Sequence, residues 1–160
     1  MISATWKIIF GSVIGTSHSK AGIPCQDKSE CKIFSCPDGS SVLVAVAADG
    51  AGSAQKAEIG ASLACSLFVD EMGALFECGG DVRSITREFA ERWITRFHNE
   101  ITLRAEAEGL NSQDFACTLL AAVVGPDCAA FLQIGDGAIV ISSPEDPDFY
   151  GWVFWPQQGL

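Results

Sequence analysis

A strand that ends in an acidic, glycine-rich turn and leads directly into a helix restricts the fold of this chain more than any other feature. Residues 42–48 are a continuous run of small apolar residues, typical of a strand that is buried on both faces. The turn Asp49-Gly50-Ala51-Gly52-Ser53 then breaks the strand. Apolar residues recur at helical spacing through residues 54–76, which predicts an amphipathic helix that packs on the sheet and ends at Gly79-Gly80.

The other apolar patterns predict one more helix and several further strands. The second helix is expected to begin at Asp81, a good cap, and to continue to Gly109. Residues 138–142 are expected to pair back across Gly135-Asp136-Gly137 as a hairpin. The remaining strands are expected at residues 6–14, 32–36, 115–124 and 129–134. Strands followed by two helices and then by strands indicate a single α+β layered domain, not alternating βαβ units.

The composition is that of one soluble globular domain, because 48% of the 160 residues are hydrophobic and 19% are charged. A net charge of -10 would repel a nucleic acid backbone, so no nucleic acid partner is expected. Residues 1–15 lack the pattern of a secretory signal. Nowhere does the chain have the run of about twenty consecutive apolar residues that a transmembrane helix needs. We therefore expect no membrane association and a cytoplasmic location.

Seven cysteines do not indicate a disulfide framework, because their number is odd and most lie in apolar runs. Cys31 and Cys36 could form half of a zinc site, but no second cysteine pair or nearby histidine completes four ligands. Ordinary thiols are the better interpretation.

The last stretch of the chain is crowded with aromatic residues, namely Phe149, Tyr150, Trp152, Phe154 and Trp155. Trp152 and Phe154 would point to the same side of an extended segment. These rings leave apolar area that a complete fold would normally cover. We interpret this as a domain that is truncated at its C-terminus, with self-association through the aromatic segment as the alternative.

Three interpretations compete for the turn that begins at Asp49. It could be a plain strand-to-helix turn with Ser53 as the helix cap. It could be a dinucleotide-binding loop, but Gln55 stands where the third glycine is needed and Asp49 would repel a pyrophosphate. It could be a site for magnesium or manganese, with the Asp49 carboxylate and the Gly50 carbonyl as oxygen ligands.

Other acidic residues are weak signals when each is considered alone. Asp27 follows a loop that Pro24 stiffens, and it could be a plain surface acid. Asp136 is equally well explained by a hairpin turn that needs positive φ. Asp114 begins the strand expected at 115–124 and is less specific still. Only the set of motifs, taken in order, points to a function.

The set resembles the PPM-type, or type 2C, serine/threonine protein phosphatases, and most of all their bacterial branch. The resemblance runs from about Trp6 to the end of the chain, and its acid-glycine motif is the most specific part. The matching motifs are Ser17-His18, Pro24-Cys25-Gln26-Asp27, Asp49-Gly50-Ala51-Gly52-Ser53-Ala54, Phe115-Ala116-Cys117-Thr118-Leu119-Leu120 and Gly135-Asp136-Gly137-Ala138.

The resemblance implies a four-layer α-β-β-α sandwich, C-terminally incomplete in this chain, with two manganese or magnesium ions in a cleft at one edge of the paired sheets. It implies that Asp49 bridges both ions, that the Gly50 carbonyl is a ligand, and that Asp27 helps to hold one ion. Asp136 would lie near the metal cluster and could bind a third ion.

The resemblance also implies the chemistry, which is hydrolysis of phosphoserine and phosphothreonine in phosphoprotein substrates by metal-activated water. Two cations are needed because the nucleophile approaches a dianion, and they neutralise the phosphoryl oxygens. Asp27 and Asp49 would be the catalytic residues, and Thr118 and Ser53 would line the site. No cysteine heads the glycine-rich, arginine-ended loop of a cysteine-dependent phosphatase.

The chain departs from the family pattern at three points. Gly22 stands where the family's phosphate-binding arginine usually lies, which leaves Lys20 and His18 as nearby candidates to bind phosphate. Ala51 stands where some members place a histidine. The chain also ends before two later aspartates that complete the coordination of one metal in the family. We therefore predict that this chain alone binds metal weakly and hydrolyses phosphoesters poorly or not at all.

Two other functions are compatible with the same residues. A non-catalytic, phosphatase-like module could bind a phosphoprotein or a regulatory partner, as the missing arginine suggests. A structural fragment could associate through its aromatic tail. Of the two histidines, His98 is interpreted as solvated on the second helix, whereas His18 could act as a proton donor.

Overall fold

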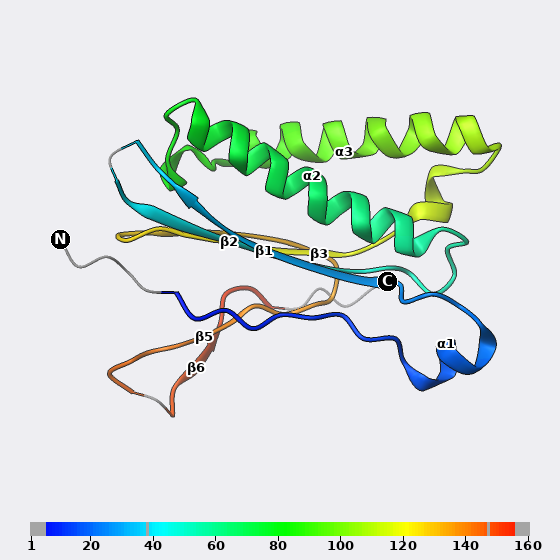
Figure 1. Cartoon of the computed structure of the whole chain (residues 1–160), viewed down its shortest axis with the longest axis horizontal. Coiled ribbons are helices and arrows are strands. Elements are labelled where there is room, and N and C mark those ends of the chain that lie inside the picture. Colours follow the sequence, from blue (N-terminus) through cyan, green and yellow to red (C-terminus); the bar gives the residue numbers. More distant parts are fainter. Residues whose placement is uncertain (1–5, 38, 147, 156–160) are drawn as a thin grey trace.

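Four antiparallel strands form the main sheet, and two long helices cover one of its faces (Figure 1). The computed structural model describes residues 6–37, 39–146 and 148–155. The strands of the main sheet lie in the order β1-β2-β3-β4, so each is hydrogen-bonded to its neighbour in the chain. Their bounds are β1 (Asp27–Ser35), β2 (Ser41–Asp49), β3 (Leu119–Val124) and β4 (Ala129–Ile134).

The strand β2 is buried on one face only, which corrects the prediction of a strand that is buried on both faces. The side chains of Val42, Val44, Val46 and Ala48 are buried, and the residues between them are half-buried or exposed. The alternation arises because the pleat of a strand sends successive side chains to opposite faces, and the helices cover only one of these faces.

The helix α2 (Ala57–Glu77) confirms the long helix expected from the sequence, but the second helix begins later than predicted. Asp81 caps a short 3-10 turn, η1 (Val82–Ser84), through a hydrogen bond from the Ser84 N–H at 3.0 Å. The helix α3 (Arg87–Glu108) has its own cap, because the Thr86 hydroxyl accepts from the Phe89 N–H. Two cap signals therefore follow one another, and only the second opens the helix. Gly109 ends α3 in the left-handed conformation.

Aromatic side chains join the two helices above the sheet. The ring of Phe68 meets the rings of Phe89 and Trp93 edge to face, and Trp93 stacks on Phe97 at 5.4 Å. The helix α2 is long and apolar enough to cross a membrane by length and composition alone, yet half of its apolar window is buried inside the fold. Packing against β1 and β2 accounts for that hydrophobicity.

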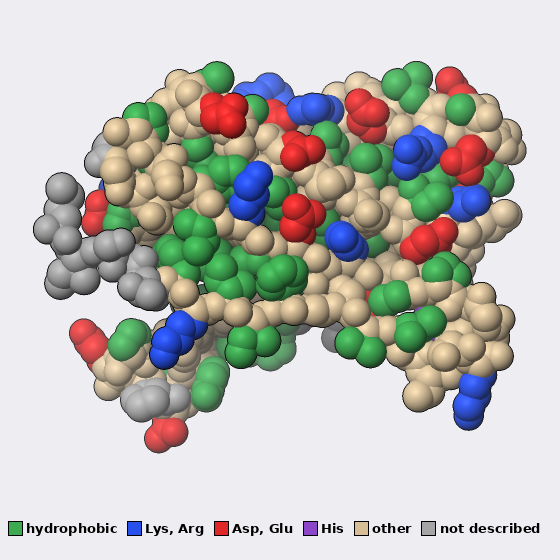
Figure 2. Space-filling model, viewed as in Figure 1, with side chains coloured by type: hydrophobic (Ala, Val, Ile, Leu, Met, Phe, Trp, Pro, Cys, Tyr) green, Lys and Arg blue, Asp and Glu red, His purple; other side chains and the backbone are tan. Residues whose placement is uncertain are grey.

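The outer surface of the helical layer is charged. Figure 2 shows acidic and basic side chains interspersed over this side of the molecule. Arg87 pairs with Glu91 along α3 at 2.9 Å, and Arg96 of α3 pairs with Glu71 of α2. Exposed pairs of this kind add little stability, so the layer is held mainly by its apolar side.

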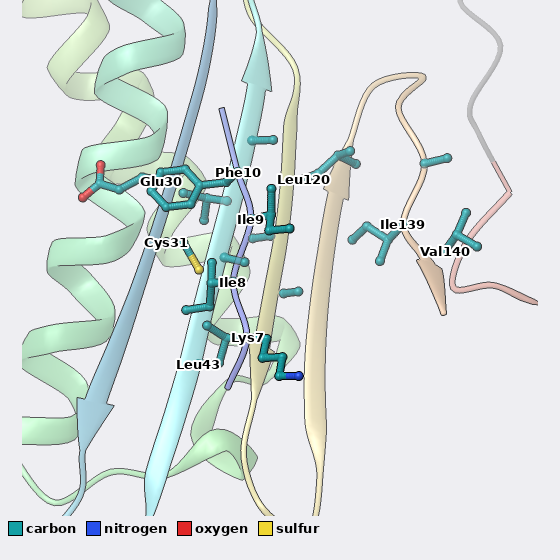
Figure 3. Close-up of a pocket in the computed structure, with 16 residues that line it drawn as sticks. Lys7, Ile8, Ile9, Phe10, Glu30, Cys31, Leu43, Leu120, Ile139 and Val140 are labelled. Carbon is teal, nitrogen blue, oxygen red and sulfur yellow. The ribbon is translucent and has the colours of Figure 1, made fainter. Parts of the chain in front are cut away.

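The opposite face of the main sheet is covered only in part. The predicted strand at residues 6–14 is absent, because this segment is extended but pairs with no strand in the described part of the chain. It lies beneath the sheet in Figure 1, and Figure 3 shows Ile8, Ile9 and Phe10 beside β2 and β3. Between the segment and the sheet is an apolar cavity of about 440 Å³, whose lining includes Leu43 and Leu120.

The predicted hairpin across Gly135-Asp136-Gly137 is wrong. Instead, β5 (Val140–Ser142) pairs with β6 (Tyr150–Trp152) in a separate two-stranded sheet on the side opposite the helices. The chain leaves the main sheet after β4, since Gly135 takes a positive φ and turns it away. The strand predicted at residues 115–124 begins later, at Leu119. A 3-10 turn, η2 (Ser112–Phe115), occupies the start of the predicted range.

The α+β class expected from the sequence is confirmed. The described residues form a helical layer, the main sheet and a small second layer of two strands. All seven cysteines are free thiols, as expected. Burial raises the pKa of the Cys65 thiol to about 12, and burial together with the charge of Asp49 raises that of Cys117 to about 11, so both are protonated and poor nucleophiles.

Candidate functional site

Three aspartates that are far apart in the sequence line one pocket at the end of the main sheet. Asp27 opens β1 and Asp49 closes β2, and the antiparallel register makes them direct cross-strand partners. Asp136 follows β4 and lines the same pocket, which has a volume of about 310 Å³. The strand ends therefore bring together the acids on which the sequence interpretation rested.

Thr118, the residue directly before β3, holds the backbone of Asp49 through hydrogen bonds. The Asp49 N–H donates to the Thr118 hydroxyl at 3.0 Å, and the Thr118 N–H donates to the Asp49 carbonyl at 2.8 Å. Thr118 also lines the acidic pocket. The two hydrogen bonds hold the carboxylate of Asp49 on a rigid strand end instead of a free loop.

Gly50 is buried in a position that only glycine can occupy without rearrangement. Its N–H donates to the Gln26 carbonyl at 3.2 Å, and it forms an isolated bridge with Cys117. A Cβ at this position would lie 2.7 Å from the Cβ of Ala57, at the start of α2. The glycine therefore lets strand β2 pass directly under the helix.

The helix cap proposed for Ser53 is wrong. The N-cap position of α2 is Lys56, and its side chain makes no capping hydrogen bond. The turn is held by backbone contacts instead, since the Ala51 N–H donates to Ala116 and the Lys56 N–H donates to Asp114. Ser53 is exposed and does not line the acidic pocket.

Gly135 positions Asp136 through its backbone conformation. Its φ is +95°, and a Cβ there would lie 2.7 Å from the methyl carbon of Thr118. The chain can turn at this point only because glycine has no side chain. The backbone turn at Gly135 places Asp136 at the pocket, and the missing side chain leaves space for Thr118.

The pocket is electrostatically unfavourable in the absence of cations. Partial burial, a hydrogen bond with the Asp27 side chain, and the charges of Asp27 and Asp136 together raise the pKa of the Asp49 carboxyl above its ordinary value. Asp49 is exposed at the end of its strand, and the Asp27 and Asp136 carboxylates line the same pocket. Like charges held this close are expected where a cation can bind between them.

The donor set fits a hard divalent cation. Carboxylate oxygens such as those of Asp27, Asp49 and Asp136 are ligands that magnesium and manganese prefer, whereas Gly50, whose carbonyl was also predicted as a ligand, is not among the residues that line the pocket. In the described part of the chain, however, no three His, Cys, Asp or Glu side chains are close enough together to hold one ion. The site therefore offers the right chemistry with fewer protein ligands than a closed metal cage.

The residues proposed to bind phosphate lie apart from the acids. His18 and Lys20 belong to the short helix α1 (Thr16–Ala21), and neither lines the acidic pocket. Gly22 caps α1 with a φ of 68°, a conformation in which an arginine would be strained. Lys28 carries the positive charge among the described residues that line the pocket.

Gly11 and Lys28 line the pocket but were not singled out from the sequence. Gly11 reaches it because the N-terminal segment crosses the sheet, where the hydroxyls of Ser12 and Ser29 are hydrogen-bonded at 3.2 Å. That segment carried only a strand signal, and no local pattern could show which strand it would cross. Lys28 is adjacent to Asp27, but its cross-strand partner is the buried Ala48.

Comparisons with known proteins show the family of the chain. The family model described as protein phosphatase 2C matches residues 14–159. Serine/threonine-protein phosphatase 3 of Escherichia coli (strain K12) is 34% identical over 137 residues, which are 86% of this chain and 53% of that protein. The chain thus spans about half the length of this curated relative.

Two solved structures that resemble the chain are described as bacterial or staphylococcal phosphatases. A crystal structure of a bacterial serine phosphatase has a TM-score of 0.50 at 16% identity, over 80% of this chain and 48% of that one. The serine/threonine phosphatase Stp1 from Staphylococcus aureus has a TM-score of 0.49 at 17% identity, over 79% of this chain and 46% of that one. At these identities, the first of the two likenesses shows a shared fold.

Proposed function

Because this chain belongs to the protein phosphatase 2C family, we propose that it supplies the acidic half of a site that hydrolyses phosphoserine and phosphothreonine in proteins. The observation that carries the proposal is the convergence of Asp27, Asp49 and Asp136 on one pocket. A relative named as a serine/threonine-protein phosphatase, 34% identical to this chain, supports the reaction class.

The residues that would hold divalent cations are Asp27, Asp49 and Asp136, with the Gly50 carbonyl. Manganese or magnesium is the proposed cofactor, in a pair, because a donor set made only of oxygen favours these ions. Such ions, when bound, offset the negative charge of a phosphomonoester and activate water as the nucleophile.

The protein's own contribution is position and charge. Thr118 holds the Asp49 backbone from two sides, so the carboxylate enters the pocket from a fixed point. Gly137 and Leu120 line the same pocket, of about 310 Å³, without adding charge. A substrate dianion would be repelled by these aspartates alone, so we expect phosphate binding to depend on cations.

Calorimetric titration with manganese chloride tests the proposal without relying on turnover. We expect weak, saturable binding to the chain, and a loss of about tenfold or more in affinity for Asp49→Asn, since one charged ligand is removed. Asp70→Asn, on the exposed side of α2, is the matched control and should bind as the original chain does. Equal manganese affinity in both variants would refute the site.

Hydrolysis of p-nitrophenyl phosphate and of a phosphothreonine peptide then tests the reaction itself. We expect manganese-dependent release of phosphate that Asp49→Asn abolishes, at a low rate in this chain, because few protein ligands hold the ions. Turnover that survives Asp49→Asn, or that needs no divalent cation, would contradict the proposed mechanism.

A further inference from the structure

A short segment before β3, residues 114–118, holds the turn that follows β2, and we call it the support segment. The Ala51 N–H donates to the Ala116 carbonyl at 2.9 Å. Thr118 and Asp49 are joined by two hydrogen bonds, one from the backbone N–H of each residue. The position of the Asp49 carboxylate therefore depends on what fixes the support segment.

The support segment precedes the regular ladder of the sheet, because β3 begins at Leu119. Its first residues belong to the 3-10 turn η2, in which the Asp114 carboxylate accepts from the Asn111 N–H at 3.0 Å. The Ala116 N–H donates to the Gln113 carbonyl at 3.1 Å and ends the turn. These local hydrogen bonds give the segment its shape, but they do not fix its place against the sheet and the helices.

Phe115 anchors the support segment in a small buried cluster that is distinct from the main core. Phe115 is 1% exposed, and it packs with the buried Ile101 and Ala105 of α3. Ile59 and Leu63 of α2 pack against the same cluster. Both helices reach it because α3 ends at the end of the sheet where α2 begins (Figure 1).

The two helices also contact the backbone around Phe115. A Cβ at Gly60 of α2 would lie 2.0 Å from the Phe115 carbonyl oxygen, so the helix and the support segment are in direct contact. The Thr102 hydroxyl of α3 lies 3.3 Å from the Ser112 hydroxyl at the start of η2. Contacts with α2 and α3 thus fix Phe115 through its ring and through its backbone.

The main core contains an equally buried phenylalanine that lies far from the acids. Phe76 is 2% exposed, and its ring centroid lies 5.5 Å from that of Phe34. Phe34 pairs with Val42, near the end of β2 that is remote from Asp49. A change at Phe76 therefore affects the acids only through the fold as a whole, whereas Phe115 belongs to the segment that holds them.

We propose that Phe115 is a positioning residue for the metal site, which keeps the Asp49 carboxylate in place through the support segment. The proposal rests on the proposed function, because it treats Asp49 as a ligand of manganese or magnesium. Groups that orient a metal ligand from outside the coordination sphere typically change metal affinity by about 10–100-fold when they are replaced. Ile101 and Ala105 thereby act on a pocket whose described lining includes no residue of α3.

Amide hydrogen exchange, followed by NMR in the metal-free chain, tests the positioning without relying on metal. Phe115→Leu should speed exchange at the Asp49 and Ala51 amides by about tenfold relative to the Val44 amide in the centre of β2, because the support segment opens locally. Phe76→Leu makes the same change in the main core and should leave this ratio unchanged. An unchanged ratio in Phe115→Leu, or the same change in both variants, would overturn the proposal.

Ile101→Val tests the same cluster from α3 with a change of one methyl group, and it decides the outcome if Phe115→Leu does not fold. The exchange ratio should rise by about threefold at the Asp49 and Ala51 amides. Ile85→Val, beside the main core, is the matched control and should leave the ratio as it is. Equal ratios in the two valine variants would contradict a role of the small cluster in positioning the turn.

Manganese titration connects the position of the turn with the metal site. At a temperature where both variants are fully folded, Phe115→Leu should weaken manganese binding by about tenfold, and Phe76→Leu should bind as the original chain does. If no form of the chain binds manganese but the exchange ratio changes as expected, Phe115 still positions the turn and the phosphatase proposal fails. Measurable manganese binding with equal affinity in the two variants would refute the role of Phe115 alone.

Discussion

The two faces of the main sheet are built from the same strands but serve different purposes. On the helix-covered face, Val44 is completely buried and Leu119 is 2% exposed. On the other face lie two acids, Asp27 at the start of β1 and Asp49 at the end of β2, which are exposed and repel each other. The alternation of side chains along each strand thus places the residues that stabilise the fold on one face and the mutually repelling acids on the other. The comparison predicts that substitutions on the first face cost stability and that substitutions among the acids do not.

Adjacent leucines on β3 test the comparison with the largest expected effect. Leu119 faces the buried core, and Leu120 lines the partly open cavities on the other face. Leu119→Ala should lower the free energy of unfolding by about 2–5 kcal/mol, since it leaves a cavity in a packed layer. Leu120→Ala should cost clearly less. Denaturant unfolding measures both, and equal losses would show that the two faces are packed alike.

Gly60 of α2 sharpens the comparison at the boundary between core and site. Replacing a helical glycine by alanine ordinarily stabilises a helix by about 1 kcal/mol. Here a Cβ would overlap the backbone carbonyl of Phe115, which leads to Thr118. We therefore expect Gly60→Ala to destabilise the fold by about 1–3 kcal/mol. Gly73→Ala, whose Cβ would meet only the Phe34 ring at 3.2 Å, is the matched control in the same helix. A stabilising effect of Gly60→Ala would contradict this packing.

Thr118→Val tests the hydrogen bond that fixes the acidic face. The change keeps the shape of the side chain but removes the acceptor of the Asp49 N–H, so we expect a loss of about 1 kcal/mol in the free energy of unfolding. Manganese affinity should fall as well, because the Asp49 carboxylate is held less rigidly. Thr118→Ser retains the hydroxyl and should restore most of both properties. If the valine and serine variants behave alike, the hydrogen bond has no role.

The smallest expected effect is a gain in stability, unlike the losses predicted above. The pKa of Asp49 is raised in the folded chain, so the folded state holds this proton more tightly than the unfolded state. Its contribution favours folding in acid and is lost as pH rises from the ordinary carboxyl pKa through the raised one. Without metal, Asp49→Asn should therefore slightly raise the thermal midpoint at neutral pH and flatten its pH dependence, unlike Asp70→Asn. A lower midpoint would show that Asp49 stabilises the fold.

Local patterns predicted the elements whose signals lie within one segment. The apolar spacing of residues 54–76 was sufficient for α2, and the strand-like run at 129–134 coincides with β4. The hairpin beyond Gly135 could not be predicted, because glycine permits a turn without deciding which strand comes next. The strand predicted at residues 6–14 has the right composition, but a strand also needs a hydrogen-bonded neighbour, and its own sequence does not specify one.

The acids of the site were identified from motifs, whereas their convergence required the register. Asp27 meets Asp49 because the first residue of β1 pairs with the last residue of β2, which depends on the length of the hairpin between them. Asp136 joins them through the positive φ of Gly135, a feature that the Gly-Asp-Gly motif did suggest. The position of β4 at the edge of the sheet, in the part of the chain that the structure describes, could not be inferred from any motif, since it depends on the order of the strands.

Paramagnetic broadening by manganese tests the central claim, that three distant aspartates converge around divalent cations. Substoichiometric manganese chloride is added to isotopically labelled chain, and the amide resonances are followed by NMR. We predict that the amides of Asp27, Asp49 and Asp136 broaden first and together, and that those of Glu88 and Glu91 on α3 stay sharp. Broadening that follows exposed acidic residues generally, with no preference for these three aspartates, would contradict the account.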